Sequence, residues 1–157
     1  MKLYSQEHLG ILRAFVKHKV KFVIIGGHAA IYHGVNRNTG DLDILIEPTA
    51  KNGDLVLTSL KSNGLEIPEM DLREFESNLV LSFGLEPDAV DIINYAPGVT
   101  FNQVFENSIN VDVEGISIKM MDIRDLLKNK EALNRGGEKS HLDKYDIEVL
   151  RRIIGRK

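Results

Sequence analysis

The sequence contains no cysteine, few aromatic residues and no long hydrophobic segment. The absence of cysteine excludes disulfide bonds, thiolate zinc sites and cysteine nucleophiles. Only four tyrosines and six phenylalanines are present, without basic residues interleaved, which argues against a stacking platform for single-stranded nucleic acid. No apolar run approaches the roughly 18 residues of a membrane-spanning helix, and Met1 to Gly10 lacks a signal-peptide core. We therefore expect a cytoplasmic protein without membrane contacts.

The remaining composition is that of a globular protein. Hydrophobic residues make up 43% and charged residues 27%, which excludes a disordered, collagen-like or coiled-coil chain. A length of 157 residues fits one domain with a sizeable core. We expect residues 1–157 to form that domain, with its central part at about 20–120 and C-terminal helices at about 121–154.

The net charge of −3 is unevenly distributed along the chain. Residues 1–118 hold 9 Lys and Arg against 16 Asp and Glu, whereas residues 119–157 hold 11 against 7. An acidic segment suits cations and a basic one suits anions such as phosphate. Solvated helix faces explain the same asymmetry, and charge alone favours that explanation.

Apolar periodicity and turn residues predict alternating helices and strands, with no repeat or linker. The predicted helices are 3–17, 28–33, 49–63, 101–105, 122–133 and 138–154, with Ser5 as the N-cap of the first. The predicted strands are 22–25, 42–46, 79–83, 89–93, 109–113 and 116–120, the last four as two antiparallel hairpins. This order predicts an α/β or α+β fold, with a mixed sheet flanked by helices and two helices at the C-terminus.

Three aspartates fall on two of the predicted strands. Asp41 and Asp43 are separated by one residue, so their side chains point to the same face of a strand. Two carboxylates this close repel each other unless a cation compensates, and Mg²⁺ is held by carboxylates together with substrate phosphates. If the strand of Asp91 lies beside that of Asp43, a third carboxylate joins them. A surface pair or a turn cap is the ordinary alternative for Asp41 and Asp43.

Gly26 and Gly27 lie between a buried strand and a helix. Such a pair lets the backbone approach a ligand and leaves N–H groups at a helix N-terminus, which suits phosphate. Arg37 and Thr39, just before Asp41, add a cation and a hydroxyl. A tight turn explains the glycines equally well in isolation, but the combination in this order favours a site for metal and phosphate.

These residues resemble a known signature. The pattern of Gly26-Gly27, then Arg37-x-Thr39-x-Asp41-Leu42-Asp43, then Val90-Asp91-Ile92 is similar to that of polymerase-β-type nucleotidyltransferases. Within that superfamily the chain is most similar to small bacterial members. These include the AbiEii-type toxins of toxin–antitoxin systems and the minimal nucleotidyltransferases.

The C-terminal part resembles the same family. Asp125-Leu126-Leu127 with Lys130 and Arg135, followed by Asp143-x-x-Asp146, is similar to the family's helical motifs. The insertion of Ser140-His141-Leu142 before Asp143 departs from the family pattern. The roles of Arg135, Lys139 and Asp143 therefore stay open, and a solvated lysine remains an alternative for Lys130.

The resemblance implies a reaction and roles for the residues. Asp41, Asp43 and Asp91 would be catalytic and bind Mg²⁺, with Mn²⁺ as an alternative. The implied nucleotide-binding residues are Gly26, Gly27, Arg37, Thr39, Lys130 and Asp146. A nucleoside monophosphate would move from a nucleoside triphosphate to a hydroxyl acceptor as pyrophosphate leaves.

The sequence does not identify the acceptor. RNA such as a tRNA end, a protein hydroxyl in a toxin–antitoxin pair, and a small molecule such as an aminoglycoside or a lincosamide are the alternatives. The short chain makes a partner protein or a homodimer plausible. A second hypothesis is a degenerate member of the fold that binds without catalysis, as an antitoxin or a regulatory subunit.

Overall fold

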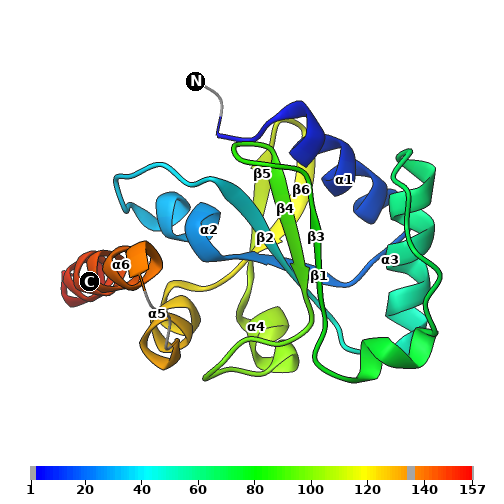
Figure 1. Ribbon diagram of the computed structural model, residues 1–157. Coiled ribbons are helices and arrows are strands. Elements are labelled where there is room, and N and C mark those ends of the chain that lie inside the picture. Colours follow the sequence, from blue (N-terminus) through cyan, green and yellow to red (C-terminus); the bar gives the residue numbers. More distant parts are fainter. Residues whose placement is uncertain (1–2, 134–136, 157) are drawn as a thin grey trace.

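The structure, a computed structural model, describes residues 3–133 and 137–156 and is built on a six-stranded mixed sheet (Figure 1). The strand order is β3-β4-β2-β1-β6-β5. The strands are β1 (Phe22–Ile25), β2 (Asp41–Ile46), β3 (Val80–Phe83), β4 (Ala89–Ile93), β5 (Ile109–Val113) and β6 (Ile116–Met120). The predicted mixed sheet is confirmed, and each strand agrees with its predicted range to within one residue.

Parallel and antiparallel pairs alternate across this sheet. Strand β2 pairs antiparallel with β1 on one side and parallel with β4 on the other. The two predicted hairpins, β3–β4 and β5–β6, are both antiparallel, as expected. The parallel β2–β4 pairing places Asp43 directly opposite Asp91.

Six α-helices surround the sheet within the described residues. They are α1 (Gln6–Lys17), α2 (Gly26–His33), α3 (Ala50–Ser62), α4 (Phe101–Asn107), α5 (Ile123–Ala132) and α6 (Gly137–Gly155). In Figure 1, α1 and α3 lie on one side of the sheet and α2, α5 and α6 on the other. None of the described helices is both long enough and apolar enough to span a membrane.

One helix start and one extra turn differ from the prediction. Helix α1 begins at Gln6, directly after the predicted N-cap Ser5, which forms a reciprocal capping box with His8. Helix α2 begins at Gly26 rather than His28. The 3₁₀ turn η1 (Leu72–Glu76) was not predicted; its apolar residues are too few to show a helical period, and Asp71 and Glu74 cap it.

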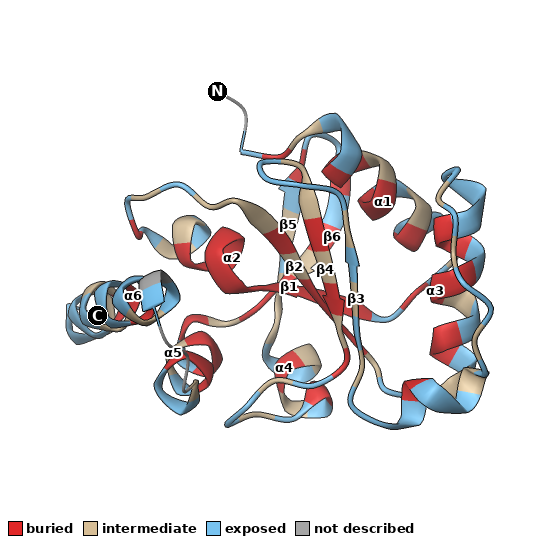
Figure 2. Ribbon diagram, in the orientation of Figure 1, coloured by how far each residue is buried: buried red, intermediate tan, exposed pale blue. Residues whose placement is uncertain are grey.

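The core is formed by strands that are covered on both faces. All four residues of β1 are buried, and the rings of Phe15 and Phe22 meet edge to face. Figure 2 shows β1 and the start of α2 as buried, whereas α6 is largely exposed. The aspartates lie on β2 and β4, which are interior strands of the sheet, and β2 pairs directly with the buried β1.

Candidate active site

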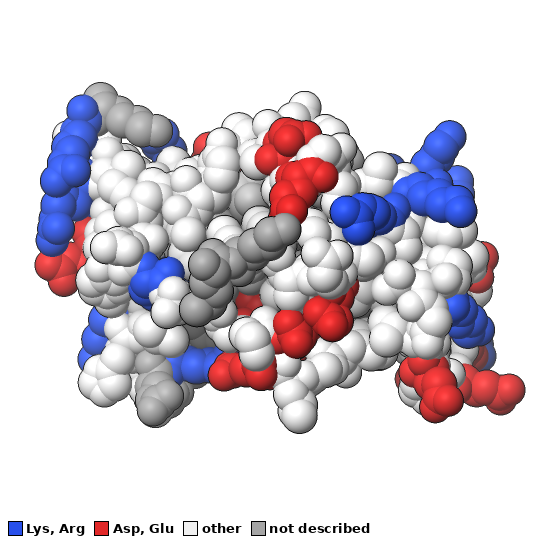
Figure 3. All heavy atoms as spheres, turned by 90° about the horizontal axis from the view of Figure 1, so that it is seen from above, with Lys and Arg blue, Asp and Glu red and all other residues white. Residues whose placement is uncertain are grey.

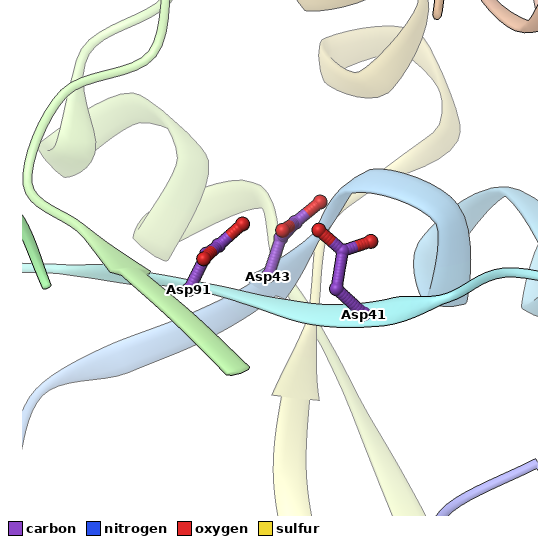
Figure 4. Close-up of side chains that lie close together, drawn as sticks. All are labelled: Asp41, Asp43 and Asp91. Atoms are coloured by element: carbon purple, nitrogen blue, oxygen red, sulfur yellow. The ribbon is translucent and has the colours of Figure 1, made fainter. Parts of the chain in front are cut away.

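Three carboxylates lie together on one face of the sheet (Figure 4). Asp41 and Asp43 come from β2 and Asp91 from β4, and one oxygen of each lies within 4.8 Å of the others. Alternation along β2 places Asp41 and Asp43 on one face, and the β2–β4 register adds Asp91 beside Asp43. The proximity of the three residues, which the sequence left conditional for Asp91, is therefore a feature of the fold.

The cluster holds more negative charge than its surroundings balance. Burial, followed by repulsion from Asp41 and Asp91, raises the pKa of Asp43 to about 7. Burial and a hydrogen bond with the Asp91 carboxyl raise the pKa of Asp41 as well. Without a compensating cation, these groups resist ionisation. A divalent ion would relieve that cost.

The two glycines allow the backbone of α2 to pass directly beside this cluster. Gly26 has φ of +68°, and a Cβ built there would clash with the Asp43 carboxyl group. A Cβ at Gly27 would lie 2.8 Å from Thr39 Cβ. No described side chain caps the N-terminus of α2, so its first N–H groups remain available to an anion.

A cavity of about 520 Å³ opens in front of the carboxylates. Its lining includes most of the predicted site residues: Gly27, Arg37, Thr39, Asp41, Asp43 and Lys130. Lys139, whose role the sequence left open, also lines it. Cations, a hydroxyl, a helix N-terminus and carboxylates thus all contribute to the lining of one cavity.

The cations Arg37 and Lys130 belong to a buried ion network. Arg37 donates two hydrogen bonds of 2.8 Å to the two oxygens of Asp146. Lys130 Nζ lies 3.1 Å from Asp146 and 3.3 Å from Asp143. Burial alone would raise the pKa of Asp146, but Arg37 and Lys130 hold that pKa below its ordinary value. The network joins α5, α6 and the segment that precedes β2.

The C-terminal residues that the resemblance grouped together differ in whether they line the cavity. Lys130 lines the cavity although its side chain is only 3% exposed. Asp146 is fully buried, is not part of the cavity lining, and contacts Arg37 and Lys130. Asp143 lies against Lys130, so the structure places it in the network. Arg135 lies outside the described residues.

Several residues near the site carried no recognisable sequence signal. Ser82 on β3 donates a hydrogen bond of 2.7 Å to Asp91, and Glu86 and Pro87 of the β3–β4 turn line the cavity. The hairpin register places Ser82 opposite Asp91, but no motif distinguishes this serine.

His28 is buried, and its ring nitrogens face the backbone oxygens of Asp41 and Leu3 at 3.1 Å. It supports β2 and does not face the cavity.

Charge is also unevenly distributed over the surface. In the view of Figure 3, acidic side chains form a band across the middle of the face, and basic side chains lie mostly toward its two ends. The end on the left carries α6, which belongs to the basic C-terminal segment of the sequence.

No family model and no curated protein matches the chain. Two similar solved structures are nucleotidyltransferases or resemble them. An antigenic nucleotidyltransferase-like protein from Paracoccidioides brasiliensis superposes with a TM-score of 0.56 at 15% identity, over 94% of this chain and 77% of its own. ANT(2")-Ia, in complex with adenylyl-2"-tobramycin, superposes with a TM-score of 0.50 at 14% identity, over 94% and 95%. The chain has a nucleotidyltransferase fold. The narrower similarity to AbiEii-type proteins stays a prediction.

Proposed function

We propose that the protein is a Mg²⁺-dependent nucleotidyltransferase that transfers a nucleoside monophosphate from a nucleoside triphosphate to a hydroxyl acceptor. The observation that carries this proposal is the meeting of the Asp41–Asp43–Asp91 cluster with a cation-lined cavity at the N-terminus of α2. The proposal treats residues 1–157 as one domain, because α5 and α6 contribute to the same cavity wall as the sheet.

The carboxylate cluster fits a hard divalent cation. Mg²⁺ binds oxygen ligands at about 2.0–2.1 Å and commonly takes one or two carboxylates plus substrate phosphates. Oxygens of Asp41, Asp43 and Asp91 within 4.8 Å of one another suit one such ion or an adjacent pair. When bound, the ion supplies charge compensation for the carboxylates and for the phosphates of the substrate. Mn²⁺ satisfies the same oxygen ligands.

The rest of the cavity lining suits a triphosphate. The start of α2 at Gly27 lines the cavity, as do Thr39 and the three cations Arg37, Lys130 and Lys139. Arg37 and Lys130 are already paired with Asp146 and Asp143, so they are held in fixed positions. We infer that they orient the phosphates, with Asp146 as their positioning residue.

We assign to Asp91 the role of accepting the proton from the acceptor hydroxyl. In the proposed step, the acceptor oxygen attacks the α-phosphorus in line with the leaving oxygen, and pyrophosphate departs. The bond from the α-phosphorus to the bridging oxygen breaks as the new phosphoester forms, and the hydroxyl proton passes to Asp91. The Ser82 hydroxyl donates a hydrogen bond of 2.7 Å to Asp91, which orients the carboxylate beside Asp43.

Different observations support different acceptors. The sequence resemblance to AbiEii-type proteins supports an RNA or protein acceptor, as in the toxin-like member of a toxin–antitoxin pair. The structure of ANT(2")-Ia contains adenylylated tobramycin, which supports a small-molecule hydroxyl. Incubation with labelled nucleotide and tRNA, total protein or an aminoglycoside distinguishes these three classes by which fraction becomes labelled.

A thermal-shift measurement with each of the four ribonucleoside triphosphates, with and without Mg²⁺, tests the proposal. A ligand at 100 times its Kd adds about 2.7 kcal/mol to the stability of the state that binds it. We expect a Mg²⁺-dependent shift that is lost in Asp41→Asn and kept in Asp54→Asn, an exposed residue on α3. No shift with any nucleotide would favour the degenerate binding module instead.

A further inference from the structure

A second cavity lies beside the first and differs from it in chemistry. Its volume is about 350 Å³, within the size range of small-molecule sites. Most of its wall is apolar and comes from Ile25, Val80, Ile93, Pro97 and Leu133. Among the described residues of the lining, Tyr95 is the one aromatic, and its side chain is partly exposed.

The two cavities meet at the proposed reaction centre. Asp43 and Lys130 line both of them, and the consecutive residues Gly26 and Gly27 contribute one to each. The first cavity gathers cations and a helix N-terminus, whereas the second offers an apolar wall and an aromatic ring. A single molecule that spans both therefore needs a polyanionic part and a planar, weakly charged part. A nucleoside triphosphate has this division, and its α-phosphate lies at the junction of the two parts.

We infer that the second cavity is the nucleoside subsite and that Tyr95 stacks against the base. This inference rests on the proposed function, because it assumes that the triphosphate occupies the first cavity. Base–aromatic stacking needs a flat, accessible ring and tolerates any base. Tyr95, 42% exposed and next to an apolar wall, meets that need.

The wall that carries Tyr95 is already fixed in position. Asn129 of α5 donates a hydrogen bond of 2.9 Å to the Pro97 carbonyl, and Ala96 pairs with Val99 in a short antiparallel bridge. Gly98 has φ of +83°, and a Cβ there would lie 2.8 Å from Ala132 Cβ. The absence of a side chain at Gly98 lets the turn pack closely against α5. The ring is thus attached to a preformed surface, which lowers the entropy lost when a ligand binds.

The acceptor is the competing occupant of this cavity. The acceptor must reach Asp91, and Asp91 lines neither of the two cavities. Because Asp91 lies outside the second cavity, the nucleoside rather than the acceptor is the favoured occupant of that cavity.

Comparison of a nucleoside triphosphate with inorganic tripolyphosphate tests the inference, because tripolyphosphate has no nucleoside. The measurement is calorimetric titration of the full chain with each ligand in the presence of Mg²⁺. We expect Tyr95→Ala to weaken nucleotide binding by between about 5-fold and 100-fold. Tripolyphosphate binding should stay within about 2-fold, and Tyr95→Phe should retain most of the nucleotide affinity. Tyr32→Ala, which removes a tyrosine of similar exposure outside both cavities, is the matched control.

Three results would overturn the inference, and a fourth would contradict the proposed function on which it rests. Unchanged nucleotide affinity in Tyr95→Ala would remove the ring from the site. Equal weakening of nucleotide and tripolyphosphate would show that the substitution only damages the fold. Failure of the wild-type protein to bind either ligand would contradict the proposed function itself. Binding of tripolyphosphate with no advantage for the nucleotide would contradict the nucleoside subsite alone.

Discussion

Ser82 and Asp91 face each other across the β3–β4 hairpin, and the serine hydroxyl donates a hydrogen bond of 2.7 Å to Asp91 Oδ1. This contact lies on the side of Asp91 that points away from β2 and its two aspartates. It leaves the other carboxylate oxygen of Asp91 to the cluster. Ser82 therefore acts as a positioning residue for Asp91.

We predict that Ser82→Ala lowers the rate of nucleotide transfer without abolishing it. A hydrogen bond to a charged group contributes about 1.5–3 kcal/mol, so a decrease in kcat of between about 10-fold and 160-fold is expected. The Mg²⁺-dependent thermal shift should persist, because the carboxylates remain, and Ser82→Thr should restore most of the rate. A loss of nucleotide binding in Ser82→Ala would contradict a role confined to Asp91.

Gly26→Ala should disable the metal site. The added methyl group would occupy the space of the Asp43 carboxyl group, and φ of +68° disfavours any residue with a side chain. We expect loss of the Mg²⁺-dependent shift and a decrease of about 1–3 kcal/mol in the free energy of unfolding. Urea unfolding with and without Mg²⁺ measures both effects. Gly155→Ala, at a position with no neighbour within 4 Å, should change neither.

The Arg37–Asp146 pair should be costly to break. Asp146→Asn leaves two buried cations with less compensation, and the expected loss of stability at pH 7 is about 3–5 kcal/mol. The pKa of Asp146 is lowered in the folded state, so its contribution is present above the ordinary carboxyl pKa and is lost as the pH falls through the lowered value. The exposed Arg152–Glu148 pair is the control, and Arg152→Ala should cost less than about 0.5 kcal/mol. Equal losses in both variants would contradict this account.

We predict that the buried His28 lowers the free energy of unfolding in mild acid. Burial, which outweighs the two backbone contacts of the ring, lowers the pKa of His28 to about 4. Below pH 6.5 the unfolded chain takes up a proton that the folded chain does not, so stability falls until the pH reaches the lowered pKa. From pH 7.5 to pH 5 the expected contribution is a loss of about 2 kcal/mol.

Chemical unfolding of wild-type protein and His28→Gln at both pH values measures this contribution. The variant should lose about 2 kcal/mol less than the wild type, because other titrating groups are common to both proteins and cancel in the difference. His141→Gln, at an exposed histidine, should behave as the wild type. Parallel pH profiles for wild type and His28→Gln would contradict the lowered pKa.

Much of the fold follows from local sequence signals. β-branched runs, glycines and capping residues locate each strand and most helices, because those signals act within a few residues. The pairing of Asp43 with Asp91 could only be stated conditionally, since strand order depends on contacts between segments about 50 residues apart.

Several residues around the carboxylates could not be predicted from the sequence. Ser82, Glu86 and Tyr95 are ordinary residue types in ordinary contexts, and only the tertiary structure brings them to the carboxylates. For Asp146, the family resemblance implied a nucleotide-binding role shared with Lys130. The arginine that it binds lies 109 residues away in the sequence, which no local pattern shows.

Because Asp143 and Asp146 belong to α6 while the cations that they hold belong to α5 and to the segment before β2, the last helix is thermodynamically linked to the phosphate-binding wall. Consider a molecule that binds α6 only when α6 is detached from the rest of the domain. Its binding would release Arg37 and Lys130 from Asp143 and Asp146 and change the affinity for triphosphate. By reciprocity, bound nucleotide must alter the affinity for that molecule by the same factor. Binding of another molecule to α6 can therefore change the affinity of the cavity for triphosphate.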